Sequence, residues 1–206
     1  ELLEEGESIV HGSPTVGNLH HMQGQVVEAR SKYQSAIAVL REVGDRHIEA
    51  VTLLNLGIWG LQTGRPDEAA DWLRAALALQ RELGLRMNEG VTLTNLGALA
   101  ICRGQLEAAA ALFLEAMSLL REDRSPIFEA EALRGLGEVH QLAGRMDEAR
   151  SAYETALEEA GAGQSFMFGP IAELLAVRGE VDDARRTLRQ ALAVAREEGD
   201  RRQEGY

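Results

Sequence analysis

A few residue groups in this sequence have types that could carry out chemistry. His20 and His21 are adjacent, with His11 nearby, and histidine is a common metal ligand. Adjacent side chains on a helix point about 100° apart, so His20 and His21 do not easily share a metal. No cysteine or carboxylate cluster completes a site around them. We therefore expect a polar helix surface here and no metal site.

Paired carboxylates form a second group, since two acidic side chains can act as general acid and general base. The pairs are Glu158-Glu159 and Asp182-Asp183. Acidic residues are also favoured at helix starts and on solvated faces, which is where these pairs fall. We interpret them as structural and predict no catalytic residue among them.

Neither a reactive thiol nor a nucleotide-binding loop is indicated. Cys102 is the only cysteine, and we interpret it as a small packing residue. Gly161-Ala162-Gly163 lacks the third glycine, the preceding strand and the acidic residue of a dinucleotide site. The sole lysine, Lys32, lies mid-helix and belongs to no Walker motif. The sequence therefore predicts a protein that is not an enzyme and has no cofactor.

Composition narrows the class of partner. The net charge is −12, and nucleic-acid binding needs clustered lysines and arginines, so we expect no nucleic acid. No apolar run reaches about eighteen residues and no signal-peptide pattern opens the chain, so we expect no membrane insertion and a cytoplasmic location. The preference for arginine over lysine indicates a GC-rich bacterial source.

A glycine-led hexapeptide recurs along the chain every forty residues. It opens at Gly24, Gly64, Gly104 and Gly144, and again at Gly179 after only thirty-five residues. A fixed period of this length indicates a repeat array, in which each element pair must stack on its neighbours to bury its apolar face. Such an array presents a long surface, so we look for a groove rather than a catalytic pocket.

A single repeat reads as two helices. From His47 to Gln62 the apolar residues follow the helical period. Gly64 suits a left-handed cap, Pro66 suits the first turn of the next helix, and that helix ends near Gly84. Small residues also recur at forty-residue spacing, which indicates close helix approach. They are Gly57, Gly97 and Gly137 on the first helices, and Ala69, Ala109, Ala149, Ala76, Ala116 and Ala156 on the second.

This order of leucines, glycines, alanines and an aromatic or leucine at set distances resembles the tetratricopeptide repeat, five times over residues 11 to 198. The long period resembles the variant found in spindle-orientation and G-protein-modulator scaffolds, and in sensor regions of bacterial transcriptional regulators and signalling ATPases. The resemblance implies an all-α fold, a right-handed α-α superhelix (solenoid) of about five helix pairs. Their first helices would line a concave groove.

We expect one array that is a fragment of a longer protein, with repeats near 11–46, 47–86, 87–125, 126–163 and 164–199. Pro14 and Pro170 predict first helices that start late, at the prolines. Gly199-Asp200-Arg201 repeats an earlier connection, as though another repeat followed. The helix predicted before it, Val181 to Glu198, carries an apolar stripe that predicts homodimers through uncapped ends. The stripe consists of Ala184, Leu188, Ala191, Leu192 and Ala195.

The resemblance places residues two to three turns along each first helix in the groove. That wall is apolar in the second and third repeats and charged in the fourth, where Glu131 and Gln141 also fall. Two alternatives remain open: these side chains are core, or a flanking segment covers them. The partner-binding residues that we predict are Val51, Leu54, Asn55, Ile58, Leu61, Val91, Thr94, Asn95, Ile101, Arg134 and Glu138.

The resemblance also argues against the ligands of two groups within the family, the chaperone-binding members and the spindle scaffolds. The cationic clamp of chaperone-binding members is absent, since its places hold residues such as Leu54 and Ile58. The asparagine ladder of spindle scaffolds is absent beyond Asn18. We predict a non-catalytic signalling scaffold that binds a peptide or helix of a protein partner. The alternative is a regulatory segment of a multidomain regulator or ATPase that binds in cis or senses an effector.

Overall fold

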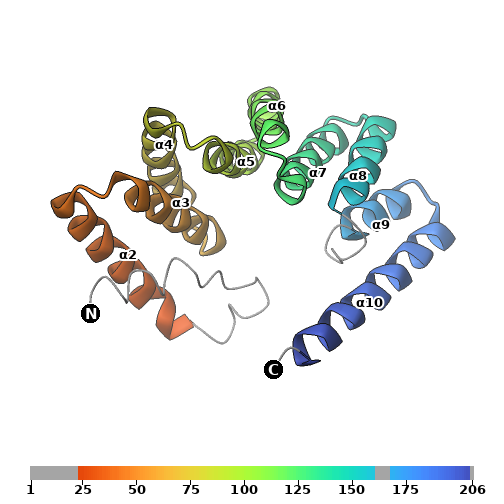
Figure 1. Ribbon diagram of the computed structural model, residues 1–206. Helices are drawn as coiled ribbons and strands as arrows, with labels where there is room; N and C mark the ends of the chain where they lie inside the picture. Colours follow the sequence, from red (N-terminus) through yellow and green to blue (C-terminus); the bar gives the residue numbers. More distant parts are fainter. Residues whose placement is uncertain (1–22, 161–167, 205–206) are drawn as a thin grey trace. The chain divides into compact units, whose positions relative to one another are not determined.

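The computed structural model describes residues 23–160 and 168–204, with side chains described over 30–160 and 168–196. Throughout these ranges the regular elements are α-helices and no strand occurs, as predicted. In chain order (Figure 1) the helices are α2 (Gln23–Val43), α3 (Arg46–Gln62), α4 (Pro66–Leu83), α5 (Arg86–Cys102), α6 (Leu106–Glu122), α7 (Pro126–Leu142), α8 (Met146–Ala160), α9 (Phe168–Val177) and α10 (Val181–Glu204). The predictions that concern His11, Pro14, Asn18, His20, His21 and the 161–167 link lie outside the described residues.

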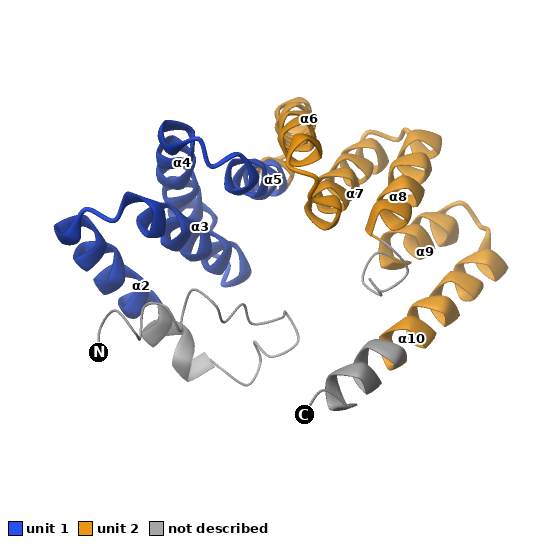
Figure 2. Cartoon of the chain, in the orientation of Figure 1, with its two compact units in different colours: residues 1–99 blue, residues 100–206 orange. Residues whose placement is uncertain are grey.

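The chain forms two compact units, unit 1 (residues 1–99) and unit 2 (residues 100–206), shown in Figure 2. In unit 1, α2 packs on α3 and α3 packs on α4. In unit 2, each helix from α6 to α10 packs on the next, and α7 also touches α9. Within these two sets, helices that are consecutive in sequence are neighbours in space, which is the packing of a repeat array.

The turn glycines predicted from the sequence have the backbone that the turns require. They are Gly44, Gly64, Gly84, Gly104, Gly144 and Gly179, with φ between 69° and 82°. A side chain is strained in this left-handed region, and glycine is not. Pro66 lies in the first turn of α4, as expected, and at the start of α3 Asp45 accepts a hydrogen bond from the Ile48 N–H at 3.0 Å.

The glycines of the first helices lie against large side chains of the second helices. A Cβ at Gly57 would stand 2.6 Å from Leu73 Cγ, and one at Gly137 would stand 2.5 Å from Tyr153 Cε1. No real Cβ tolerates such a contact, so only glycine allows these helices to pack this closely. The packing reason inferred from the recurrence of Gly57 and Gly137 is confirmed.

Close packing of the pairs produces an apolar core in each unit. In unit 1 a cluster joins α2, α3 and α4, and it consists of Tyr33, Ile37, Leu53, Leu54, Leu56, Trp59, Leu73 and Ala76. In unit 2 one cluster joins α8, α9 and α10 and consists of Ala149, Tyr153, Ile171, Leu174, Leu175 and Ala184. A smaller one consists of Ala130, Leu133 and Ala156. The recurrent alanines predicted at close approaches are fully buried at 69, 76, 109, 116, 149 and 156.

A salt bridge recurs at the junctions between repeats, and the sequence analysis did not predict it. In each case an arginine in the last turn of a second helix holds a glutamate in the first turn of the next helix, eight residues on. The pairs are Arg41–Glu49 at 2.6 Å, Arg81–Glu89 at 2.7 Å and Arg121–Glu129 at 2.5 Å. The three glutamate side chains are only 7%, 13% and 8% exposed, so each depends on its arginine for a charged partner.

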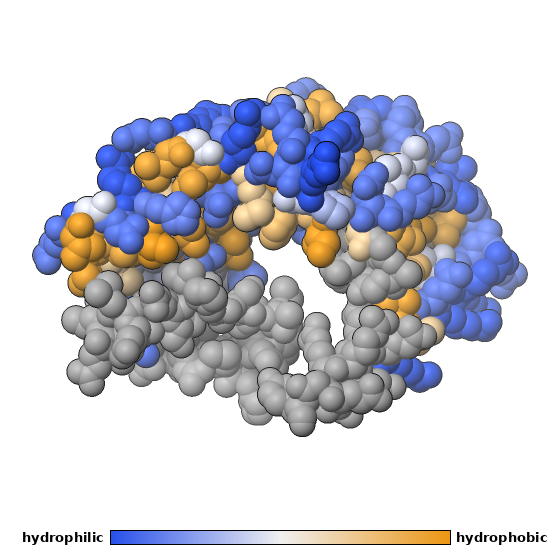
Figure 3. Space-filling model, viewed as in Figure 1, coloured by the Kyte–Doolittle hydropathy of each residue, from blue (hydrophilic) through white to orange (hydrophobic). Residues whose placement is uncertain are grey.

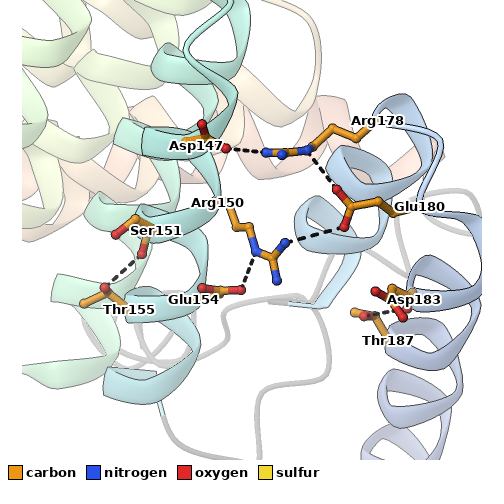
Figure 4. A network of polar contacts seen from close by, with 9 residues as sticks. All are labelled: Asp147, Arg150, Ser151, Glu154, Thr155, Arg178, Glu180, Asp183 and Thr187. Atoms are coloured by element: carbon orange, nitrogen blue, oxygen red, sulfur yellow. Dashed lines mark hydrogen bonds and ion pairs between the residues drawn. The ribbon is translucent and has the colours of Figure 1, made fainter.

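The fourth junction is held by other contacts. The sequence has Gly161 and Gly169 where an arginine and a glutamate would continue the series. Figure 4 shows a network that ties α8 to the turn between α9 and α10. Arg178 of this turn binds Asp147 of α8 at 2.5 Å and Glu180 at 2.9 Å, and Arg150 binds Glu180 at 3.5 Å.

The last two helices differ from their predicted bounds. α9 begins at Phe168, two residues before Pro170, which therefore lies in the first turn rather than at the start. α10 runs to Glu204 instead of ending at Glu198, so the helix passes through Gly199. Gly199 therefore does not act as the helix breaker that the sequence predicted.

Gln80 is a polar residue in the core of unit 1. Its side chain is fully buried, and neither its amide nitrogen nor its amide oxygen has a hydrogen-bond partner among the described residues. Leu40 and Leu120, forty residues away on either side, are buried apolar residues at the equivalent position. A buried amide without partners is destabilising, so this position favours leucine.

We expect Gln80→Leu to raise the free energy of unfolding by about 1–3 kcal/mol, because it removes a desolvated amide and adds apolar contact. Chemical denaturation followed by circular dichroism measures the change. Gln62→Leu, at an exposed position of α3, is the matched control and should change little. A loss of stability in Gln80→Leu would show that the amide has partners in solution.

Candidate interaction surface

The predicted groove residues of unit 1 lie on α3 and α5, and they differ in exposure. Leu54 is only 5% exposed and belongs to the core cluster with α2 and α4. Val51, Ile58, Leu61 and Val91 are half-buried. Of these, Ile58, Leu61 and Val91 rest on that cluster and keep part of their surface. The first helices of unit 1 therefore offer a partly exposed apolar row above a closed core.

Two of the three polar groove residues of unit 1 form hydrogen bonds with their own helix. Thr94 is buried, and its hydroxyl donates to the Gly90 carbonyl at 3.0 Å. Asn95 is half-buried, and its Nδ2 donates to the Val91 carbonyl at 2.8 Å. Asn55 is half-buried at the equivalent place on α3. These side chains add little directional recognition, so the surface of unit 1 is mainly apolar in character.

Unit 2 carries charge where unit 1 carries apolar side chains. On α7, Arg134 binds Glu131 at 3.0 Å and Glu138 at 3.6 Å, so one guanidinium lies between two carboxylates. All three side chains are between 28% and 45% exposed. Ile101, also predicted for the groove, is half-buried at the end of α5. On the face shown in Figure 3, hydrophobic residues gather over α3 and α4, whereas the visible surface of α8 is mainly hydrophilic.

Tyr153 lies directly beneath the charged row of α7. Its ring packs against Gly137, and its hydroxyl donates to Gln141 Oε1 at 2.9 Å. Burial raises the pKa of Tyr153 to about 12, and the negative charges of Glu138 and Glu173 add to this, while Arg134 opposes it. The pKa of the buried phenol therefore depends on the charges of this row.

Two tryptophans and two arginines form an aromatic cluster in unit 1. Trp59 and Trp72 lie with ring centroids 6.2 Å apart. Arg65 stands 5.2 Å over the Trp59 ring and Arg30 stands 5.9 Å over the Trp72 ring. Glu68 binds Arg30 at 2.5 Å and Arg65 at 3.6 Å. This cluster joins α2, α3 and α4 through cation–π contacts, so it stabilises the packing of unit 1.

The other residues considered for chemistry are placed separately. Cys102 is exposed, so its interpretation as a packing residue is wrong. Glu158, Glu159 and Asp182 are exposed, and Asp183 is half-buried. Within the ranges that the structure describes, no three His, Cys, Asp or Glu side chains gather as metal ligands. None of the described helices combines the length and the apolar character needed to cross a membrane.

Comparison with known proteins decides the family. A tetratricopeptide repeat model matches residues 13–82, 61–122 and 88–160, and a second model of the same description matches residues 172–190. The chain belongs to the tetratricopeptide repeat family. Proteins of this family are generally non-catalytic scaffolds for protein interactions. No curated protein matches the sequence.

Solved structures show the same fold at low sequence identity. BtubC (BKLC) from P. vanneervenii superposes with a TM-score of 0.70 and 20% identity, covering 92% of this chain and 78% of that one. A putative kinesin light chain of P. anserina with nearly identical TPR-like repeats has a TM-score of 0.67 and 16% identity, over 94% and 93%. The apo form of RapI has a TM-score of 0.67 and 16% identity, over 87% of this chain and 51% of that one.

The raised pKa of Tyr153 predicts a stability change in alkali. The folded pKa of about 12 lies above the ordinary value of about 10. The neutral phenol therefore contributes stability that is fully present below about pH 10 and is lost as the pH rises toward 12. We expect the free energy of unfolding of the wild type to fall more steeply over this range than that of Tyr153→Phe.

Tyrosinate absorbance gives an independent readout of the same titration. Glu138→Gln should lower the pKa of Tyr153, because it removes a negative charge that opposes ionisation. Glu154→Gln, on the exposed side of α8, is the control and should leave the titration unchanged. Parallel stability profiles for wild type and Tyr153→Phe would contradict the assignment.

Proposed function

We propose that this protein is a non-catalytic scaffold that binds a segment of a protein partner on the outward faces of its first helices. In unit 1 the binding face is the row of Val51, Ile58 and Leu61 on α3, joined by Val91 on α5. The observation that carries the proposal is the spacing, packing and exposure of the side chains in this row. The α3 members follow helical spacing, all four are half-buried, and Ile58, Leu61 and Val91 rest on the closed core.

The chemistry of this row favours an apolar partner segment. Burying one such side chain fully contributes about 1.5–3 kcal/mol, and ordering a flexible segment offsets a large part of the sum. A dissociation constant of about 1 μM, roughly −8 kcal/mol, is the reasonable expectation. An amphipathic helix that places apolar residues one turn apart matches a row on a single helix face.

The charged row of unit 2 supports the same class of partner. Arg134 is already paired with Glu131 and Glu138, so its guanidinium is not available to grip a terminal carboxylate. The charged row instead disfavours acidic side chains in a partner, because an unpaired acidic residue there would face the carboxylates of Glu131 and Glu138. We therefore propose two separate contributions: unit 1 binds an apolar segment, and α7 of unit 2 disfavours acidic side chains in a segment that contacts it.

A displayed library of random peptides tests the proposed face. Peptides enriched on the wild type should carry apolar residues at helical spacing. Ile58→Glu and Leu61→Glu should each weaken their binding by about tenfold or more, because about 1.4 kcal/mol of lost apolar contact is a factor of ten. Fluorescence anisotropy measures the dissociation constants, and circular dichroism confirms that each variant is folded.

Ala78→Glu is the matched control, because Ala78 is exposed on α4, the second helix of the same pair. It introduces the same charge in the same unit away from the proposed face, so binding should persist. Equal affinity of the selected peptides for wild type, Ile58→Glu and Leu61→Glu would show that the partner binds elsewhere.

A further inference from the structure

α10 leaves exposed a side chain that the equivalent helices bury. Leu73, Phe113 and Tyr153 occupy one position of α4, α6 and α8, and they are 0%, 1% and 3% exposed. The equivalent residue of α10 is Leu188, which is 50% exposed. One turn further, Leu192 is 58% exposed. Ala184, one turn earlier on the same stripe, is buried in a cluster with residues of α9.

The other second helices show what covers this position. Phe113 of α6 packs against Gly135 of α7, a helix that belongs to the following repeat, and a Cβ at Gly135 would overlap the phenyl ring. The position therefore meets two first helices, that of its own repeat and that of the next. Among the described residues, α10 packs on α9, the first helix of its own repeat. The face that carries Leu188 and Leu192 has the chemistry of an interface between repeats.

The sequence that follows this face is that of a junction between repeats. Residues 41–49 read REVGDRHIE, residues 81–89 read RELGLRMNE and residues 196–204 read REEGDRRQE. In the first two copies the helix ends before a glycine with φ of 76° or 69°, and the arginine binds the glutamate eight residues on. The arginine also follows the apolar row by one turn, as Arg81 follows Leu77 and Arg196 follows Leu192.

We propose that residues 196–204 are a further junction of this kind. The Leu188–Leu192 face of α10 then docks the first helix of an additional tetratricopeptide repeat, which begins at Arg201. When it docks, α10 ends before Gly199, which turns into the left-handed region. Without it α10 continues through Gly199, as the structure shows.

An extended chain tests this inference. Residues 91–122 are placed after Gly205 in place of Tyr206, so that the junction at 196–205 continues in the register of residues 81–90. The added repeat should be helical and protected from hydrogen exchange, and the melting temperature should rise. Leu188→Glu should lower the melting temperature of the extended chain much more than that of the 206-residue chain. Gln190→Glu, at an exposed position of α10, is the control and should affect neither.

Gly199→Ala gives a second readout that does not depend on the apolar face. Alanine is better than glycine inside a helix, so the substitution should raise the melting temperature of the 206-residue chain. In the extended chain alanine would be strained at a left-handed position, so the melting temperature should fall. Gly84→Ala, at a junction glycine with φ of 69°, is the reference for the size of that fall.

Two results would overturn the proposal. One is an added repeat that exchanges freely, together with Gly199→Ala raising the melting temperature of both chains. The other is a 206-residue chain that dimerises in sedimentation and becomes monomeric on Leu188→Glu, because a second copy would then cover the face.

Discussion

The contact between a glycine of one helix and a large side chain of the next is the interaction on which the rest of this structure depends. Leu73 lies against Gly57, Phe113 against Gly135 and Tyr153 against Gly137. Each glycine lacks the Cβ atom that would keep the two helices further apart. The large side chain is thereby buried completely, and it contributes apolar stabilisation at the centre of each interface.

This contact also decides which surface is left for a partner. Once the first helices pack on their neighbours through these glycines, some of their side chains keep part of their surface, among them Ile58 and Leu61 on α3 and Arg134 on α7. The glutamates of the recurrent Arg–Glu pairs hold α3, α5 and α7 at their first turns. The position and the chemistry of the candidate surface are thus consequences of packing.

Much of this fold could be predicted from the sequence because its determinants are local and repeated. The left-handed turns at Gly64 and Gly84, the proline at the start of α4 and the close approach at Gly57 each follow from residue type and spacing. The Arg–Glu pairs escaped prediction because their eight-residue spacing matches no helical contact and requires the chain to turn between the partners. The same period of forty that revealed the glycines could have revealed Arg41, Arg81 and Arg121.

The candidate site was less predictable, because exposure depends on neighbouring helices rather than on a residue's own helix. Leu54 and Ile58 lie one turn apart, yet Leu54 is buried by contact with α2 and α4, whereas Ile58 keeps part of its surface. Cys102 is small and apolar but lies past the last packed turn of α5, where it is exposed. The helical period identifies a face, and tertiary packing decides which of its residues remain accessible.

The free energy of unfolding of Gly137→Ala tests the glycine contact most directly. The added methyl group must displace the buried Tyr153 ring, and overpacking of this kind costs about 1–3 kcal/mol, which exceeds the helix propensity gained. Gly169→Ala on α9 is the comparison, since nothing lies within 4 Å of the added Cβ. The account predicts that Gly137→Ala destabilises the protein while Gly169→Ala leaves it unchanged or more stable. Equal stabilisation by both substitutions would contradict it.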